Sequence, residues 1–516
     1  MEAGDFWQLS CIPSSFVVPE DCFGAVMYQI FPDRFYAKGL CDTSGKLEPF
    51  WIHKDKNEVP EYRPDEHGEV KNCDFFGGNL KGITSKLDYL TSLHVKTLYL
   101  NPIFEAASNH RYDTADYRAI DPLLGTEEDF AELCREAGKR GIRVMLDGVF
   151  NHTGDDSRYF NRAGYYDTVG AYQSENSPYY PWYSFTEWPE EYDGWWGIKT
   201  LPAVNEEDPE YRKFIITGED SVIRRWLRLG ASAWRLDVAD ELPDDFIVDI
   251  RRVMEEENPE AFLLGEVWED GSNKIAYAKR RRYLLGHETH GLMNYPLRTA
   301  LLHYLRGGRA EDFREAMETV RENYPKPAFY SGLNILGTHD TPRILTALGE
   351  EGVPATREER GAYHLTIERW GLAMARLRMA AMLLYAFPGS PTIYYGDETG
   401  MEGFEDPMNR RTFPWGRENK ELQRLFKSLG ALREERASLR QGDIRYIGAE
   451  GAILVFERTL NGERTVMAFN AGDVEWEICL PWDALFATEL LTSQRFLVQN
   501  GRLRVLLPPV SGMILG

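Results

Sequence analysis

The feature that most restricts the fold of this chain is a short apolar run that ends in polar or charged residues and is followed by a helix-like stretch. This pattern is the sequence form of a βα unit. In the stretch 126–140, for example, Phe130, Leu133 and Ala137 share one helical face, and Gly141 supplies the stop. Eight such runs occur, at residues 25–31, 95–103, 142–150, 231–238, 261–268, 289–295, 333–340 and 390–398. Eight strands with intervening helices predict an α/β chain built on a closed (β/α)8 TIM barrel.

Two segments break this alternation. Residues 153–204 are rich in Tyr, Trp, Pro and Asp and lack a helical period, which indicates an inserted domain after the third strand. After Arg440 the chain changes to short predicted strands separated by Gly, Asn and Asp turns, as in an antiparallel β-sandwich. These strands are IRYIGA, AILVFER, RTVMAFN, VEWEICL and RLRVLLP. We therefore expect the barrel in residues 1–152 and 205–436, the inserted domain in 153–204, and a C-terminal β-sandwich domain in 437–516.

Composition excludes several classes of partner. Lys and Arg number 59 and Asp and Glu 82, so the formal charge of −23 has the wrong sign for binding nucleic acid or an anionic membrane. The first residues carry acids where a signal peptide needs basic residues, which favours a cytoplasmic protein. The apolar segment 374–387 contains two arginines and fits a buried helix. Six scattered cysteines are best interpreted as reduced structural thiols.

Charged residues at the ends of the runs are the candidates for chemistry, because the catalytic residues of a barrel project from the carboxyl ends of its strands. Alone, each has an ordinary explanation as a helix cap, a turn residue or an ion-pair partner. Several carboxylates that meet at one barrel mouth would repel one another, which indicates a chemical use. The candidates are Asp147, Asn151 and His152 on the third run, Arg235, Asp237 and Glu241 on the fourth, Glu266 on the fifth, His339, Asp340 and Arg343 on the seventh, and Asp397 and Glu398 on the eighth.

The chemistry that this set suggests is cleavage of a glycosidic bond, which needs a carboxylate nucleophile and a second carboxyl group as acid and then base. Asp237 and Glu266 are the natural pair. We expect Arg235 to keep Asp237 ionised. Val267 and Trp268 would give Glu266 the apolar surroundings that suit a proton donor.

Three further features fit a sugar substrate. Asp340 would stabilise the positive charge that develops on the sugar in the transition state. His152 and His339 can donate hydrogen bonds to sugar hydroxyls. Aromatic residues gathered in the segment 158–196 offer flat faces for sugar rings.

The motifs DGVFNH, WRLDVADE, GEVW and GTHDT, in this order, resemble the four sequence regions of the α-amylase family, glycoside hydrolase family 13. The similarity extends from about Val26 to Gly403. YQIFPDRF, FFGGNLKGI and NPIFEAASNHRYDTADY are similar to motifs of the neopullulanase, cyclomaltodextrinase and maltogenic amylase subgroup. The resemblance implies hydrolysis with retention at α-linked glucose, on α-1,4 bonds and with some tolerance of α-1,6 bonds, in maltooligosaccharides, starch, dextrins or cyclodextrins.

The resemblance also implies roles for single residues. Asp237 matches the nucleophile, Glu266 the acid/base and Asp340 the third acid. The other matches hold sugars: Arg235, His152 and His339 at the cleavage point, Tyr112 stacked on that sugar, and Asp406 and Arg410 on the next one.

Departures from the family pattern modify these expectations. Subgroup members carry an N-terminal β-domain before YQIFPDRF, and here 27 residues precede that motif. We therefore expect a monomer with an open site that accepts long linear chains. Tyr112, Trp182, Trp195 and Trp196 are the available stacking surfaces, and packing of two or three of these tryptophans in the core of the insertion is an equal alternative. The subgroup motif MPKLN, which accompanies mixed α-1,4 and α-1,6 activity, reads LPAVN at 201–205.

No cofactor is expected to be required. Relatives that hold calcium do so with Asn and Asp side chains after FPDRF and in FFGGD, whereas this chain reads FYAKGLCDTSG and ends the second motif in Asn79. We predict no metal site and no obligatory calcium. Optional calcium stays open, and Asn151 is the first residue to suspect for it.

Two alternatives remain beside the hydrolase. A transglycosylase would use the same acids, because a sugar hydroxyl can intercept the covalent intermediate in place of water. A non-catalytic sugar-binding protein on the same fold is the other alternative.

Overall fold

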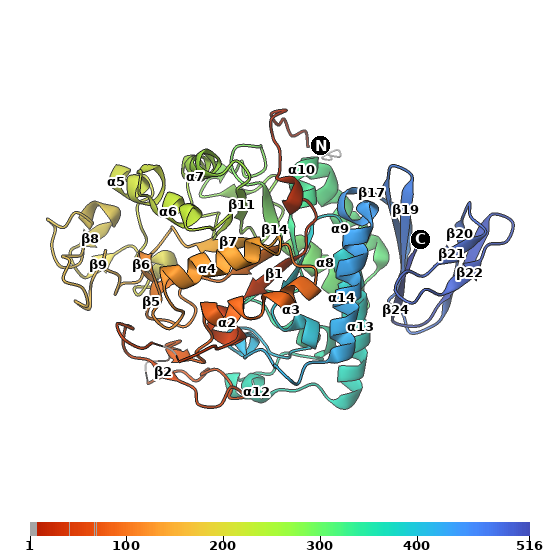
Figure 1. The fold of residues 1–516 in the computed structure, drawn as a ribbon, viewed down its shortest axis with the longest axis horizontal. Helices are drawn as coiled ribbons and strands as arrows, with labels where there is room; N and C mark the ends of the chain where they lie inside the picture. Colours follow the sequence, from red (N-terminus) through yellow and green to blue (C-terminus); the bar gives the residue numbers. More distant parts are fainter. Residues whose placement is uncertain (1–7, 41, 67, 69) are drawn as a thin grey trace, which may run out of the picture.

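The computed structural model describes residues 8–40, 42–66, 68 and 70–516, and its centre is a closed barrel of eight parallel strands (Figure 1). Each strand lies within one of the eight predicted runs, which confirms the predicted (β/α)8 barrel. The strands are β1 (Met27–Ile30), β4 (Thr97–Leu100), β7 (Arg143–Gly148), β10 (Ala233–Leu236), β11 (Phe262–Gly265), β14 (Gly291–Asn294), β15 (Leu333–Ile335) and β16 (Ser390–Tyr394). β1 pairs with β4 on one side and β16 on the other, which closes the barrel.

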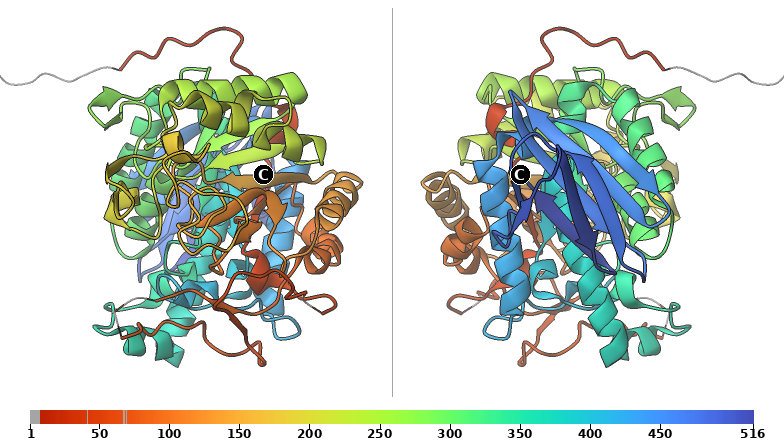
Figure 2. Two further views of the ribbon diagram at one scale, coloured as in Figure 1. Left: turned by 90° about the vertical axis from the view of Figure 1, so that its left-hand side faces the viewer. Right: turned by 90° about the vertical axis from the view of Figure 1, so that its right-hand side faces the viewer.

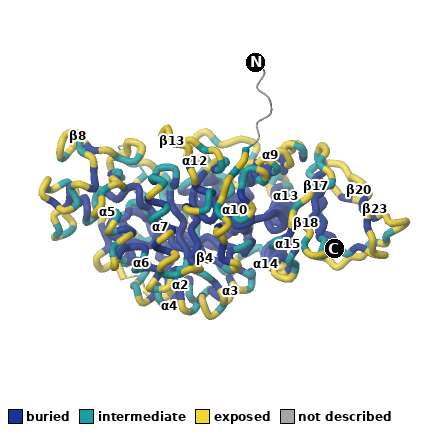
Figure 3. The backbone as a smooth tube through the Cα atoms, turned by 90° about the horizontal axis from the view of Figure 1, so that it is seen from above, coloured by how far each residue is buried: buried dark blue, intermediate teal, exposed yellow. Residues whose placement is uncertain are grey.

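Helices surround the barrel, and the buried strands form the dark centre of Figure 3. The helix predicted in 126–140 is α4 (Glu127–Gly138), whose N-terminus is closed by a capping box between Thr126 and Asp129. The other helices of seven or more residues are α6 (Val222–Arg228), α7 (Asp244–Glu257), α8 (Tyr295–Leu305), α9 (Ala310–Asn323), α13 (Ile367–Ala386) and α14 (Lys420–Glu435). The shorter ones are α1 (Pro32–Phe35), α2 (Leu80–Thr84), α3 (Leu87–Ser92), α5 (Pro209–Arg212), α10 (Lys326–Ser331), α11 (Ile344–Gly349), α12 (Arg357–Ala362) and α15 (Ala437–Gln441).

The apolar segment 374–387 lies in α13, as expected for a buried helix, and α13 packs against the C-terminal strand β24 (Ser511–Leu515). Among the described residues, no helix combines the length and the apolar character needed to span a membrane. The five described cysteines are free, and three of them are buried. Cys41 lies outside the described residues.

The segment after β7 forms a small layer at one end of the molecule, with the hairpin β8 (Phe185–Glu187) and β9 (Glu191–Tyr192) (Figures 1 and 2). Aromatic side chains around Phe160 make its core. The LPAVN segment returns to the barrel beside the third strand, because Ala203 forms a bridge with His152. The domain boundaries stay a prediction.

Antiparallel sheets form the opposite end of the molecule (Figures 1 and 2). One sheet contains β17 (Asp443–Glu450), β18 (Ile453–Leu460), β19 (Glu463–Asn470) and β24, and the other strands pair as β20 (Trp476–Pro481) with β23 (Arg502–Leu507) and β21 (Phe486–Thr488) with β22 (Arg495–Leu497). A separate apolar cluster that includes Val455, Ile478 and Leu503 lies between the layers. This confirms the antiparallel β-structure predicted after Arg440, although the sequence pattern missed β21, β22 and β24. The remaining strands are β2 (Trp51–Ile52), β3 (Asp74–Phe75), β5 (Phe104–Ala106), β6 (Thr114–Ile120), β12 (Ile275–Ala276) and β13 (Lys279–Arg280).

Candidate active site

The register of the barrel brings the two principal acids together. Leu236 at the end of β10 pairs with Gly265 at the end of β11. Asp237 and Glu266 are the next residues of these two strands, so they leave the barrel side by side. Both are buried, with 7% and 4% of their surface exposed.

A single guanidinium group holds these acids. Arg235, fully buried on β10, donates through Nη1 to Asp147 Oδ1 at 2.6 Å and to Asp237 Oδ1 at 2.7 Å. Its Nη2 lies 2.8 Å from Glu266 Oε2. Asp147 also accepts from the hydroxyl groups of Tyr99 and Tyr112, at 2.7 and 2.8 Å. Three carboxyl groups therefore share one fixed cation.

The charge balance of this cluster favours retention of a proton. Burial raises the pKa of Asp237 well above its usual range, and the negative charge of Glu266 adds to this, while Arg235 opposes it. Burial likewise raises the pKa of Asp147. The predicted contact between Arg235 and Asp237 is present, and the role of Arg235 in keeping Asp237 ionised stays a prediction.

The surroundings of Glu266 also differ from the prediction. Besides the contact with Arg235, Glu266 Oε2 accepts from the main-chain N–H of Val238 at 2.9 Å, and Oε1 accepts from Trp268 Nε1 at 3.3 Å. The predicted apolar environment is thus wrong, since two N–H donors and the guanidinium of Arg235 contact this carboxyl group. Trp268 is 47% exposed and stacks on Tyr295 at a centroid distance of 4.1 Å.

Asp340 follows β15 and lies in a second group of charged residues. His339 Nε2 is 3.1 Å from Asp340 Oδ2, and Arg410 Nη2 is 3.5 Å from Asp340 Oδ1. Burial, together with the negative charge of Glu266, raises the pKa of Asp340 to about 7. Arg410 also pairs with Asp406 at 2.8 Å, so the predicted pair for the neighbouring sugar is joined to the third acid.

The remaining predicted sugar-binding residues, Tyr112 and His152, adjoin these two groups. The ring of Tyr112 stacks on His339 at a centroid distance of 5.1 Å with an angle of 6° between the planes. His152 Nε2 is 3.1 Å from the main-chain oxygen of Tyr112. Burial lowers the pKa of His152 to about 4 and that of His339 well below its usual range, so both rings are neutral near pH 7. The structure thus brings the nine predicted residues into one contiguous cluster.

Several residues of the cluster were not predicted to belong to it. Asn101 Nδ2 donates to the hydroxyl of Tyr112 at 2.9 Å, and Gln29 Nε2 bridges Asn101 Oδ1 and His339 Nδ1 at 3.1 and 3.0 Å. Tyr99 binds Asp147, as described above. Gln29 lies within β1, Tyr99 within β4, and Asn101 directly after β4. A search of the strand ends that included uncharged polar residues could therefore have found them.

The acids of the eighth strand are separate from the cluster. Asp397 pairs with the buried Arg343 at 3.1 Å. Glu398 accepts hydrogen bonds from the hydroxyl groups of Tyr28 and Tyr89, at 2.7 and 2.6 Å, and burial raises its pKa to about 7. These two carboxyl groups are engaged in contacts between the barrel and the elements that surround it.

The four aromatic residues proposed as stacking surfaces differ in exposure. Trp182 is only 3% exposed and packs against Tyr211 and other rings, so of the two alternatives for this residue the structure has the packed one. Trp196 is 80% exposed. It stacks on Trp195, which in turn stacks on His152. Trp195 and Trp196 therefore continue the candidate site outward from His152.

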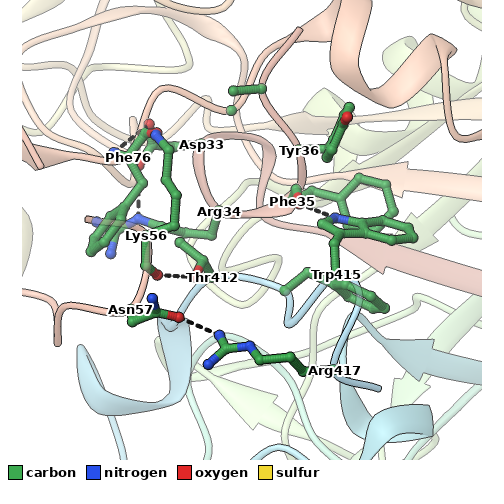
Figure 4. A pocket seen from close by; sticks show the side chains of 13 residues that line it. Asp33, Arg34, Phe35, Tyr36, Lys56, Asn57, Phe76, Thr412, Trp415 and Arg417 are labelled. Carbon is green, nitrogen blue, oxygen red and sulfur yellow. Dashed lines mark hydrogen bonds and ion pairs between the residues drawn. The ribbon is translucent and has the colours of Figure 1, made fainter. Parts of the chain in front are cut away.

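A cavity of about 490 Å³ lies apart from the three acids (Figure 4). Tyr36, Lys56, Trp415 and Arg417 are among the residues that line it, and none of the three predicted acids does. The ammonium group of Lys86 lies 3.9 Å from the ring centre of Tyr36 and 4.0 Å from that of Trp415. Both rings are thus already engaged by a cation, and we assign no substrate to this cavity.

Removal of divalent cations is predicted to leave the protein intact. Asn79 accepts from Gly82 N at 2.7 Å as the N-cap of α2 and donates to the main-chain oxygen of Lys38 at 3.1 Å. Among the described residues, no three or more His, Cys, Asp or Glu side chains are grouped so that they could hold a metal ion. We predict that dialysis against EDTA leaves both the hydrolysis rate and the melting temperature unchanged. A large loss that calcium restores would contradict this, and Asn151, which is 3% exposed, would then be the first residue to replace.

A (β/α)8 barrel with paired carboxyl groups at the carboxyl ends of its strands is an arrangement in which glycosidic bonds are hydrolysed. Comparison with known proteins agrees: residues 29–442 match the family described as "Alpha amylase, catalytic domain". The chain therefore belongs to the α-amylase family.

The similarity of the chain to individual relatives is as follows. It is 37% identical to an amylopullulanase from Thermoanaerobacter thermohydrosulfuricus over all of this chain and 38% of the relative. It is 33% identical to a cyclomaltodextrinase from Geobacillus thermopakistaniensis over 96% of this chain and 77% of the relative. Among solved structures, Ttha1563 from Thermus thermophilus has a TM-score of 0.79 and 32% identity, covering 96% of this chain and 99% of that one. The chain spans less than half the length of the amylopullulanases that it matches, between 30% and 42%.

Proposed function

We propose that this chain is a retaining α-glucan hydrolase that cleaves α-1,4-glucosidic bonds, with Asp237 as nucleophile and Glu266 as acid and base. The observation that carries the proposal is the attachment of both carboxyl groups to the two terminal nitrogens of Arg235, at 2.7 and 2.8 Å. Retaining enzymes need their two carboxyl groups only about 5–5.5 Å apart, whereas inverting enzymes leave room for water between them. Two groups bound to one guanidinium favour the short separation.

In the first step, an oxygen of Asp237 forms a bond to the anomeric carbon as the bond to the leaving oxygen breaks. The proton of Glu266 passes to that oxygen, so a neutral sugar leaves and a glycosyl ester remains on Asp237. In the second step, Glu266 takes a proton from water, whose oxygen attacks the same carbon and releases Asp237. Two inversions restore the α configuration.

The other residues of the cluster are assigned to sugar binding. Asp340, with Arg410 and His339 against it, lies where it can hydrogen-bond sugar hydroxyls and stabilise positive charge at the anomeric carbon. Tyr112 offers its ring. The one N–H of neutral His152 is directed at the main-chain oxygen of Tyr112, which leaves Nδ1 to accept from a sugar hydroxyl, and His339 is proposed to hold Asp340 and to contact the sugar at the cleavage point. Asp406 and Arg410 are proposed to hold the next sugar.

The names of relatives support the substrate class. Amylopullulanases, a cyclomaltodextrinase and neopullulanase 2 of Thermoactinomyces vulgaris are all at least 32% identical to this chain. The similarity to the intracellular maltogenic amylase of Bacillus subtilis, at 33% identity, supports an intracellular place of action. We also propose a monomer, which sedimentation of the 59.4 kDa chain would test.

The proposed function is tested by incubating the protein separately with maltoheptaose, a cyclodextrin, pullulan and starch and identifying the products over time. Release of shorter glucans from at least one of them is expected. Products longer than the substrate would reveal transfer to sugar acceptors, and products from pullulan would reveal the linkage that is cut. Binding without any product from the four substrates would contradict the proposal and favour a sugar-binding protein.

A further inference from the structure

The loop after β11 reaches back to the loop after β10, and one arginine joins the two. This loop contains the hairpin of β12 and β13 and then a run of basic residues, Lys279 to Arg282. Arg281 is the one buried residue of that run, with 5% of its surface exposed. A buried guanidinium needs partners for its donors. The question is therefore what Arg281 binds.

Its partners are main-chain oxygens of the turn that carries the proposed nucleophile. Arg281 Nη1 donates to Asp240 O at 3.1 Å, and Nη2 donates to Ala239 O at 3.3 Å and also to Leu242 O. Its Nε lies 3.0 Å from the carboxylate of Asp244, in the first turn of α7. One side chain thus fixes three carbonyl groups within six residues of Asp237.

The same turn holds a strained residue. Val238 has a φ of 39°, in the left-handed region that a β-branched residue rarely adopts. Such a conformation persists only when the surrounding structure enforces it. In this conformation the N–H of Val238 donates to Glu266 Oε2 at 2.9 Å. The strained residue therefore connects the turn after Asp237 to the proposed acid.

Side chains reinforce the connection between the two loops. The hydroxyl of Tyr283 donates to Asp240 Oδ1 at 2.6 Å, and Lys274 binds the other oxygen of the same carboxylate. The guanidinium of Arg281 lies 4.9 Å from the ring centre of Tyr283. The loop after β11 consequently holds the turn through both its main chain and its side chains.

We propose that Arg281 is a positioning residue, which holds the turn after Asp237 so that the N–H of Val238 orients Glu266 for proton transfer. The inference rests on the proposed function. Loss of Arg281 would let Val238 relax towards negative φ, which turns its N–H away from Glu266. The acid step would suffer most, because a proton donor that is displaced by about 1 Å can cost about 100-fold in rate.

The test compares two substrates that differ in their need for an acid. Maltotriose has a poor leaving group that requires protonation, whereas fluoride leaves α-maltosyl fluoride with little help. Arg281→Met should lower kcat on maltotriose by about 10- to 100-fold. The fold-loss in kcat on α-maltosyl fluoride should be smaller by a factor of about ten or more, and KM should change little for either substrate. Arg280→Met, at an exposed neighbour, is the matched control and should keep both rates.

A second pair of variants tests the strained residue itself. Glycine adopts positive φ without strain. In the Val238→Gly background, the loss of kcat on maltotriose caused by Arg281→Met should therefore be several-fold smaller than in the wild-type chain. If Arg281→Met does not fold, Arg281→Lys is measured with the same two substrates, because a single ammonium cannot bind three carbonyl groups in the same way.

Equal losses on both substrates, or no loss, would overturn the proposal and leave Arg281 a structural residue. If the wild-type chain turns over neither substrate, the proposed function has failed rather than the role of Arg281.

Discussion

Replacement of Asp237 by Asn should abolish hydrolysis of maltoheptaose, with a loss of at least about 1,000-fold in kcat. The amide cannot form the glycosyl ester, but its oxygen can still accept the hydrogen bond from Arg235 that Asp237 now accepts at 2.7 Å. The variant should fold and bind oligosaccharide. Its melting temperature should not fall, since the change removes one carboxylate from a cluster in which three share a single cation.

The matched control is Asp245→Asn, which alters an exposed carboxylate in the first turn of α7 and should leave the rate unchanged. More than about a tenth of the wild-type rate in Asp237→Asn would contradict the assignment, because removal of a nucleophile costs several orders of magnitude.

Replacement of Glu266 by Ala should have a comparably large effect, about 100- to 10,000-fold on maltoheptaose, because the leaving oxygen loses its proton donor. This variant should be rescued by an external nucleophile. With α-maltosyl fluoride the glycosyl ester still forms, and azide can attack it without a general base. Added sodium azide should therefore raise the rate and yield α-maltosyl azide.

The configuration of the azide product separates the two roles. The β-azide would mean that azide had replaced the nucleophile, as is expected for Asp237→Asn. Either that product from Glu266→Ala, or the absence of any acceleration, would show that Glu266 is not the acid and base.

The sequence predicted the barrel well because parallel strands are buried on both faces and therefore read as apolar runs. Asp237 and Glu266 could also be placed together, since a barrel puts all carboxyl ends of its strands at one mouth. Weaker patterns failed: β24 reads SGMIL at the very end of the chain, and its place beside β19 depends on contacts distant in sequence.

The surroundings of side chains were less predictable than their positions. Local sequence could not tell which of Trp182 and Trp196 is a stacking surface and which packs in a core. Trp182 packs in a core, and Trp196 is 80% exposed. The apolar neighbours of Glu266 in sequence were misleading, because Trp268 donates to it through its indole N–H, and Arg235 on β10 and Val238 just after β10 also contact it. Burial of Arg281 within a basic run likewise depends on a turn about forty residues earlier.

The central claim, a double displacement by Asp237 and Glu266, is tested most directly by the anomeric configuration of the first product. Proton NMR spectra recorded during rapid hydrolysis of maltoheptaose should show the new reducing ends appearing as the α-anomer, with the β-anomer growing later by mutarotation. Initial appearance of the β-anomer would contradict the claim, because it would mean that water attacks the sugar directly and that no glycosyl ester forms on Asp237.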